Sequence, residues 1–167
     1  RLASGPGFWG DDLDAPVRQV EGGPIDYLMM DYLAEVTMSI MQKQRDRDPS
    51  AGYARDFIPL MERILPRVMD GGIRVVTNAG GVNPEGCAEA LLEAAQRTGR
   101  AQGLKVGMVL GDNLIPRLDE LMAQGHPFTN MDTGEPLELI RDRVRSANVY
   151  MGAEPIIRVL EQGAQVV

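Results

Sequence analysis

The chain has few of the residues that build disulfides, metal sites or membrane spans. It holds one cysteine, Cys87, and one histidine, His126, among its 167 residues. A single cysteine excludes an intrachain disulfide, so a reducing cytoplasm is the expected compartment. No apolar run approaches the roughly 20 residues that a membrane-spanning helix needs. The sequence also lacks a signal peptide, zinc-site spacing, a P-loop and a Ser-His-Asp set.

Positive charge is also scarce. Lys and Arg number 17 against 24 Asp and Glu, which gives a net charge of -7 and an isoelectric point near 4.7. This balance opposes binding to nucleic acid or to an anionic membrane, since both carry negative charge. We expect a small-molecule ligand, with a phosphate or carboxylate group, as the partner.

Length and composition are those of one globular domain. The apolar fraction is 44% and the charged fraction 25%, and a chain of this size buries about 70% of its unfolded surface. We expect a single α/β domain over residues 1–167. Arg1 begins in an extended segment and Val166 starts a strand, so we expect a fragment of a longer protein. An unpaired strand at Val166 would favour association into a homo-oligomer.

A helix, a glycine and a short apolar strand recur along the chain. Glycine is favoured just past a helix end, and nearly all-apolar strands are typical of sheets covered on both faces. The glycine and its strand occur at Gly23 with 25–30, Gly72 with 73–76, Gly103 with 104–110, and Gly163 with Val166. This order predicts an open, mostly parallel sheet with helices on both faces, Rossmann-like. A partial TIM-like barrel is the alternative, and either fold places its site at the carboxyl ends of the strands.

The helices show apolar stripes at helical spacing. Within one of them Pro66 should kink or end the helix. Residues 124–145 lack a clear period and are interpreted as an excursion, such as a hairpin or a lid. The best-defined stripe consists of Phe57, Leu60, Met61, Ile64, Leu65 and Val68.

The first polar loop, residues 4–11, contains the dinucleotide fingerprint G-x-G-x-x-G, and Asp31 follows about 20 residues later as a ribose-binding acid would. Acidic residues and Pro16 delay the helix, which counts against an NAD site. A loop that lines another polar site and a purely structural turn stay open. Phe8 and Trp9 either close over a ligand or pack on the neighbouring loop. The candidate binding residues are Ser4, Gly5, Gly7 and Asp11.

The second polar loop, residues 77–84, leads into a helix. Asn83 is a good N-cap and Pro84 suits the first helical position. Free amides at a helix N-terminus can hold a phosphate or a carboxylate. On this interpretation Gly81→Val abolishes anion binding and leaves the fold intact; a capped turn without a ligand is the alternative. The candidate binding residues are Asn78, Gly80, Gly81 and Asn83.

Three carboxylates, Asp31, Glu35 and Asp112, are nearest the predicted strand ends. They are candidates for acid–base catalysis or Mg²⁺ binding, and solvated caps are the alternative, with Asp112 as the N-cap of the next helix. We expect both loops, Asp31 and residues 111–113 to converge in one cleft. Cys87 is interpreted as a buried filler rather than a nucleophile, and His126 as a surface residue.

Several long motifs occur in order: GPGFWGD, DYLAEVTM, RDRDPSAGYARDF, GIRVVTNAGGVNPEGCAEAL, MDTGEPL and SANVYMGAEPI. Together they resemble the N-terminal part of the acyclic terpene utilisation (AtuA-type) family, over essentially the whole chain. The resemblance implies a role in bacterial breakdown of acyclic terpenes such as citronellol and geraniol, through acyl-CoA intermediates. It names no catalytic residues or cofactor. Many relatives are expected to carry a second acid after Asp112, where this chain has Asn113.

Two functions are consistent with these observations. The first is a catabolic enzyme, or half of one, that acts on acyclic terpenes or branched acyl-CoA compounds. The alternative is a non-catalytic subunit of the same pathway that binds a ligand or acts as a scaffold.

Overall fold

The computed structural model describes residues 1–167, and the chain divides into two compact units. The first comprises Arg1–Val109 and Gly152–Val167, and the second comprises Leu110–Met151. The expectation that residues 1–167 act as a single domain stays a prediction.

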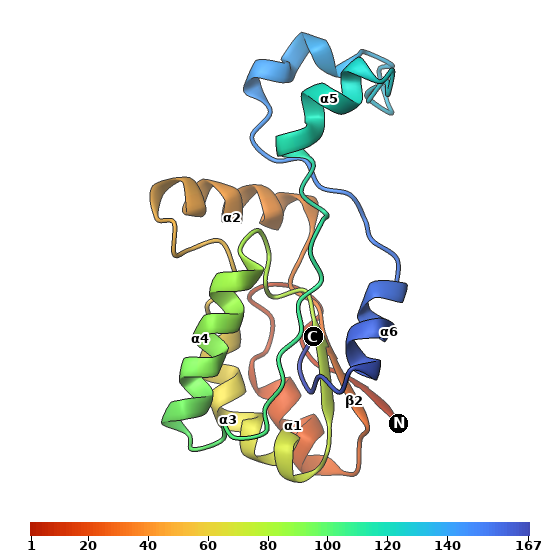
Figure 1. Cartoon of the computed structure of the whole chain (residues 1–167). Helices are drawn as coiled ribbons and strands as arrows, with labels where there is room; N and C mark the ends of the chain where they lie inside the picture. The colour runs from red at the N-terminus through yellow and green to blue at the C-terminus, as the bar shows by residue number, and fades with distance from the viewer. The chain divides into compact units, whose positions relative to one another are not determined.

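The first unit is built on a small, open, parallel sheet (Figure 1). Its strands are β1 (Leu2–Ser4), β2 (Tyr27–Met30) and β3 (Arg74–Thr77), in the order β1-β2-β3. Ala3 lies opposite Leu28, and Leu28 lies opposite Val75. All three side chains are buried, so this face of the sheet forms part of the core. The α/β class and the open parallel sheet are confirmed, and the finer Rossmann-like assignment stays a prediction.

The predicted strand over residues 104–110 is wrong. Only Val106 makes a ladder contact, a parallel bridge to Val166. Gly107 interrupts the segment, and glycine weakens a strand because it contributes no side chain to the packing. Gly107 also allows Val159 to approach its backbone more closely than any side chain would permit.

Val166 also bridges to Val75, so it is paired on both sides and buried. The prediction that it starts a strand next to the sheet agrees with these bridges. The reason given for association does not hold, because Val166 is not an unpaired edge. Association itself stays a prediction.

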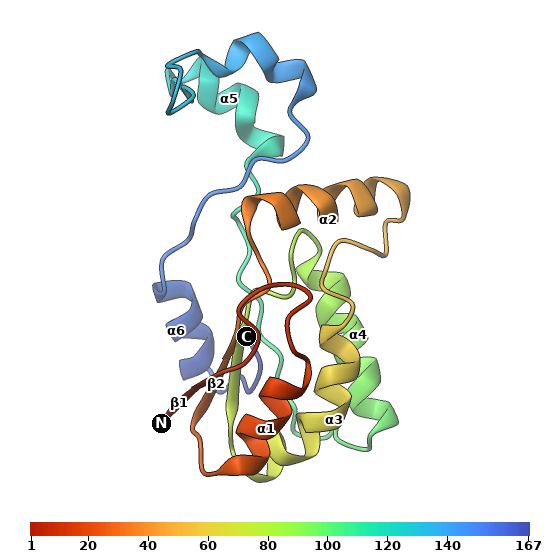
Figure 2. The ribbon, with the colours of Figure 1, turned by 180° about the vertical axis from the view of Figure 1, so that it is seen from behind.

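Helices cover both faces of the sheet (Figures 1 and 2). On one face lie α1 (Asp14–Gly22), α3 (Phe57–Asp70) and α4 (Pro84–Arg97), which pack side by side. On the other lies α6 (Glu154–Glu161). The Nη1 of Arg74 donates to the Leu160 carbonyl at 3.3 Å, which ties α6 to β3.

The apolar stripe predicted for α3 is confirmed. Its six residues are buried, together with Ile58. Of the two effects predicted for Pro66, an end of the helix is absent, because α3 continues to Asp70, and a kink stays a prediction. Proline removes one backbone hydrogen bond, and here the packing of the buried stripe offsets that loss.

A further helix, α2 (Glu35–Arg47), follows β2 and crosses the carboxyl edge of the sheet (Figure 2). Only Met41 of this helix is buried, while Val36 and Ile40 are exposed. No helix of the structure combines the length and apolar character needed to cross a membrane.

The second unit contains η1 (Ile115–Arg117), α5 (Leu118–Ala123) and η2 (Leu137–Arg143). Arg141 holds Asp119 through two hydrogen bonds of 2.6 and 3.0 Å. Residues 124–145 contain turns and η2 and no strand, so the hairpin expected there is absent.

Candidate functional site

The carboxyl ends of β2 and β3 are joined by two side chains. Asp31 directly follows β2 and Asn78 directly follows β3. The Nδ2 of Asn78 donates to Asp31 Oδ1 at 2.7 Å, and its Oδ1 accepts from the Tyr32 N–H at 2.8 Å. One carboxamide therefore fixes both the side chain of Asp31 and the backbone after it.

Further contacts fix Asp31 and leave one of its oxygens free. Its Oδ1 also accepts from the Leu33 N–H at 3.2 Å, and its own N–H donates to the Pro6 carbonyl at 2.9 Å. The Oδ2 accepts no hydrogen bond within the chain, and the residue is exposed. The first loop, Asp31 and the second loop thus meet at one edge of the sheet. That they line one cleft stays a prediction.

The first loop hydrogen-bonds with itself. The Oδ2 of Asp11 accepts from the Gly7 N–H at 2.9 Å, and its Oδ1 accepts from the Asp12 N–H at 2.8 Å. These donors lower the pKa of Asp11. In a dinucleotide site such amides bind pyrophosphate, whereas here a carboxylate of the chain already holds them. This arrangement counts against the NAD interpretation.

Gly5 in the same loop serves close packing. A Cβ there would lie 2.9 Å from Met30 Cγ and 3.0 Å from Pro16 Cγ. Of the aromatic pair, Trp9 packs against the core and its Nε1 donates to Asp56 Oδ1 at 3.1 Å. Phe8 is exposed, and Ser4 ends β1.

The capping role of Asn83 is confirmed. Its side chain accepts from the Gly86 N–H at 3.1 Å, and Pro84 is the first residue of α4. Its Nδ2 donates to the Ala51 carbonyl at 2.9 Å, which ties the loop to the segment before α3.

The prediction that Gly81→Val leaves the fold intact is wrong. A Cβ on Gly81 would clash with Met41 Sδ and lie 2.6 Å from the Gly52 carbonyl oxygen. Its φ is +54°, a conformation that favours glycine. Gly81→Val would therefore disturb the fold rather than leave it intact.

Most backbone N–H groups of this loop also donate hydrogen bonds to other groups of the chain. The Ala79 N–H donates to Thr77 Oγ1 at 3.1 Å, and the Val82 N–H donates to the Gly52 carbonyl at 2.8 Å. The Gly81 N–H donates to the Asn78 carbonyl at 3.1 Å, and the Asn83 N–H to the Gly80 carbonyl at 2.9 Å. A phosphate would have to displace these bonds, so the capped turn is the better description.

The other two carboxylates differ in position. Glu35 is exposed at the first position of α2. Asp112 lies in the second unit, where its Oδ2 accepts from Asn148 Nδ2 at 2.9 Å. It does not cap the next helix: Asn113 Oδ1 instead accepts from the Ile115 N–H at 3.0 Å. Convergence of residues 111–113 with the rest of the site stays a prediction. No three His, Cys, Asp or Glu side chains are grouped to hold a metal ion.

Sequence reasoning missed Tyr32. Its side chain is 1% exposed and its buried hydroxyl has no hydrogen-bond partner. The ring meets Phe57 edge-on, with centroids 6.1 Å apart. Burial raises the pKa of Tyr32, and Asp56 and Cys87 raise it further. An unpaired buried polar group costs about 1 to 3 kcal/mol. The sequence alone does not show that the hydroxyl of a tyrosine following a strand is buried without a hydrogen-bond partner.

Cys87 and His126 have the settings expected of them. Cys87 is buried, and this raises its thiol pKa to about 12, as suits a filler rather than a nucleophile. His126 is an exposed loop residue of the second unit.

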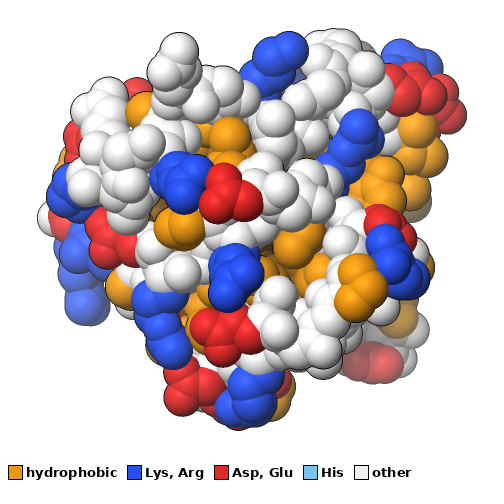
Figure 3. Space-filling model, turned by 90° about the horizontal axis from the view of Figure 1, so that it is seen from below, with side chains coloured by type: hydrophobic (Ala, Val, Ile, Leu, Met, Phe, Trp, Pro, Cys, Tyr) orange, Lys and Arg blue, Asp and Glu red, His pale blue; other side chains and the backbone are white.

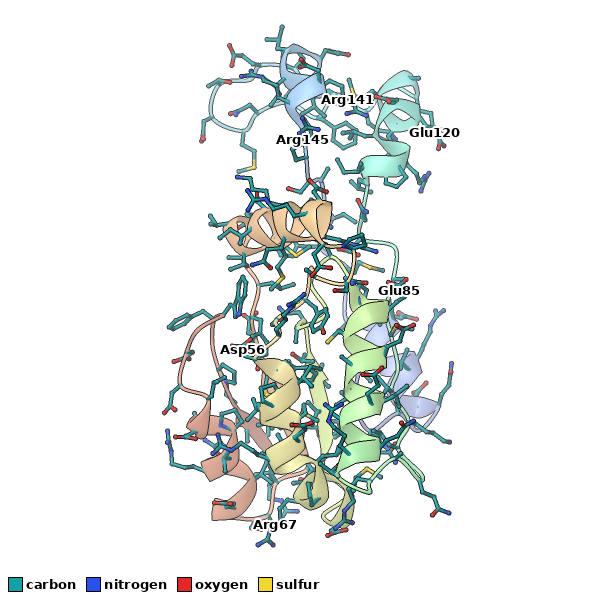
Figure 4. The ribbon with its side chains drawn as sticks, turned by 90° about the vertical axis from the view of Figure 1, so that its left-hand side faces the viewer. Asp56, Arg67, Glu85, Glu120, Arg141 and Arg145 are labelled. Carbon is teal, nitrogen blue, oxygen red and sulfur yellow. The ribbon has the colours of Figure 1, made fainter.

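The opposite, amino ends of the strands carry a shallow depression of about 330 Å³. Figure 3 views the molecule from this end, where basic and acidic side chains alternate. Arg67, which lies at this end of α3 (Figure 4), lines the depression together with Asp26 and Asp70. None of the predicted site residues lines it.

Fold and site together define an α/β protein whose polar loops meet at the carboxyl edge of a small parallel sheet. The sequence model of the acyclic terpene utilisation family protein AtuA matches residues 1–167, so the chain belongs to this family. Comparisons with curated proteins and with solved structures gave no match.

Proposed function

We propose that the chain is a catabolic enzyme, or half of one, that acts on acyclic terpenes or on their branched acyl-CoA derivatives. The ligand binds at the carboxyl edge of the sheet, beside Asp31. The family name supports the pathway. The observation that carries the site is the Asn78–Asp31 hydrogen bond of 2.7 Å, which orients a carboxylate and leaves its Oδ2 free.

A carboxylate held in this way suits two tasks. It can accept a hydrogen bond from a ligand hydroxyl, and it can take a proton from a reacting group. Its orientation is set before a ligand binds, so little rotamer freedom is lost on binding. Glu35 begins α2 three residues after Tyr32, and we propose it as a second acid at the same edge.

Asp31→Asn tests this proposal because it keeps the shape of the side chain and removes the charge. Wild type and variant are incubated with the CoA esters of citronellic and geranic acid, and the masses of the small molecules are measured. The expected result is a new product with wild type and at least a tenfold lower rate with Asp31→Asn. Asp46→Asn, an exposed acid on α2, is the matched control and should react at the wild-type rate. Equal rates for all three proteins would contradict the role of Asp31.

One observation favours the alternative, a non-catalytic ligand-binding or scaffold subunit. The amides of both glycine loops are used within the chain, as the Gly7–Asp11 and Val82–Gly52 hydrogen bonds show. Melting curves with CoA, acyl-CoA, NAD and Mg²⁺ separate the two functions. A rise in Tm without any product would favour the binding subunit.

A further inference from the structure

A buried phenol without a partner lies next to Asp31 in the chain. The Tyr32 N–H is held by Asn78 Oδ1 at 2.8 Å, and its ring contacts Phe57 edge-on. Both the backbone and the ring are therefore fixed. The hydroxyl is held at one place and donates to no group of the chain.

The titratable groups that influence this hydroxyl do not accept a hydrogen bond from it. Asp56, the N-cap residue of α3, and Cys87, in the first turn of α4, both raise the pKa of Tyr32. Helix N-termini carry partial positive charge and favour a negatively polarised atom. Asp56, shown at the start of α3 in Figure 4, already accepts the hydrogen bond of Trp9 at 3.1 Å.

We infer that the Tyr32 hydroxyl donates a hydrogen bond to a neutral carbonyl oxygen of an apolar ligand that displaces the Trp9 indole. A neutral acceptor is favoured because an anion would be repelled by the Asp56 carboxylate. The rest of the ligand is apolar, because Tyr32 belongs to the same hydrophobic cluster as Phe57 and Met41. The inference rests on the proposed function for its ligand class, an oxygen-bearing acyclic terpenoid.

The first loop provides the entry. Trp9 is only partly buried and is held by one side-chain hydrogen bond. Gly10 follows it with a φ of +95° and no atom close to where a Cβ would lie. The loop is therefore not packed against other residues at Gly10, directly after the indole.

Trp9 is the single tryptophan of the chain, so its emission reports this displacement directly. The probes are methyl citronellate, whose ester carbonyl accepts a hydrogen bond, and citronellene, an acyclic hydrocarbon without oxygen. Each is titrated into wild type, Tyr32→Phe and Tyr53→Phe. Tyr53 is the matched control, a half-buried tyrosine whose hydroxyl is not among the buried unpaired groups.

The expected result is an emission shift with the ester in wild type and in Tyr53→Phe. Tyr32→Phe should weaken ester binding about tenfold and leave citronellene binding unchanged. Equal ester affinity in wild type and Tyr32→Phe would overturn this inference alone, and the proposed function would stand. A wild-type chain that responds to neither probe would overturn the ligand class of the proposed function and this inference with it. Thermal unfolding of Tyr32→Phe confirms that the variant is folded.

Discussion

Asn78 and Asp31 lie 47 positions apart in the sequence and form a hydrogen bond of 2.7 Å at the ends of neighbouring parallel strands. The other end of the same carboxamide holds the Tyr32 N–H. The two bonds use the donor and the acceptor of one carboxamide, so neither a carboxylate nor an ammonium group at this position could make both. These two hydrogen bonds, here called the Asn78 clamp, link the position of the free Asp31 Oδ2 to the position of the buried Tyr32 phenol.

Asn78→Ala should lower the free energy of unfolding by about 1 to 2 kcal/mol, because two hydrogen bonds are lost at a partly exposed site. Asn78→Asp should cost more at pH 7, since it places a second carboxylate against Asp31. As the pH falls and one carboxyl binds a proton, this extra cost should shrink. Urea unfolding at pH 7 and at pH 3.5 measures both effects. A gap between the two variants that stays constant with pH would show that the clamp is not formed.

Two glycines with similar backbones offer a matched pair of substitutions. Gly81 has φ +54° and Gly99 has φ +68°, but only Gly81 is in contact with other residues at the position of a Cβ. Gly99→Ala should cost about 1 to 2 kcal/mol from backbone strain alone. Gly81→Ala should cost about 1 to 3 kcal/mol more, because its Cβ would press on Met41 and on the Gly52 carbonyl.

Urea unfolding of the two variants gives the difference directly. Equal costs would mean that the second loop is open at Gly81, which would restore the anion site as a plausible use of this loop.

Local features of the fold could be predicted from the sequence, and contacts between distant segments could not. The Asn83 cap depends on a bond three residues away, and the stripe of α3 depends on helical spacing alone. The strand predicted at 104–110 does not form because a strand needs a pairing partner along its length. Here the only bridge partner is Val166.

The same distinction applies to the site. That Asp31 and the two loops meet follows from parallel strands, whose carboxyl ends share one edge. Packing between segments distant in sequence decides the rest. It places Met41 where a Cβ on Gly81 would lie, and it leaves the Tyr32 hydroxyl without a partner. Neither the glycine nor the tyrosine could be assigned these surroundings from the sequence.

Cys87 should be nearly inert in the folded chain. Burial raises its thiol pKa to about 12, whereas an ordinary cysteine has a pKa of about 8.5. At pH 8 the reactive thiolate is then about a thousandfold less populated than in the unfolded chain, and the buried sulfur is also shielded from reagents. Labelling with iodoacetamide, followed by mass spectrometry, should be at least about a thousandfold slower in buffer than in denaturing urea. Because the folded state holds the neutral thiol, the contribution of Cys87 to the free energy of unfolding should be constant below about pH 8.5 and should fall as the pH rises above it. Cys87→Ala removes this group and should flatten the decline between about pH 8.5 and 11. Rapid labelling of the folded chain at pH 8 would contradict the burial of Cys87 and would reopen its interpretation as a nucleophile in the first turn of α4.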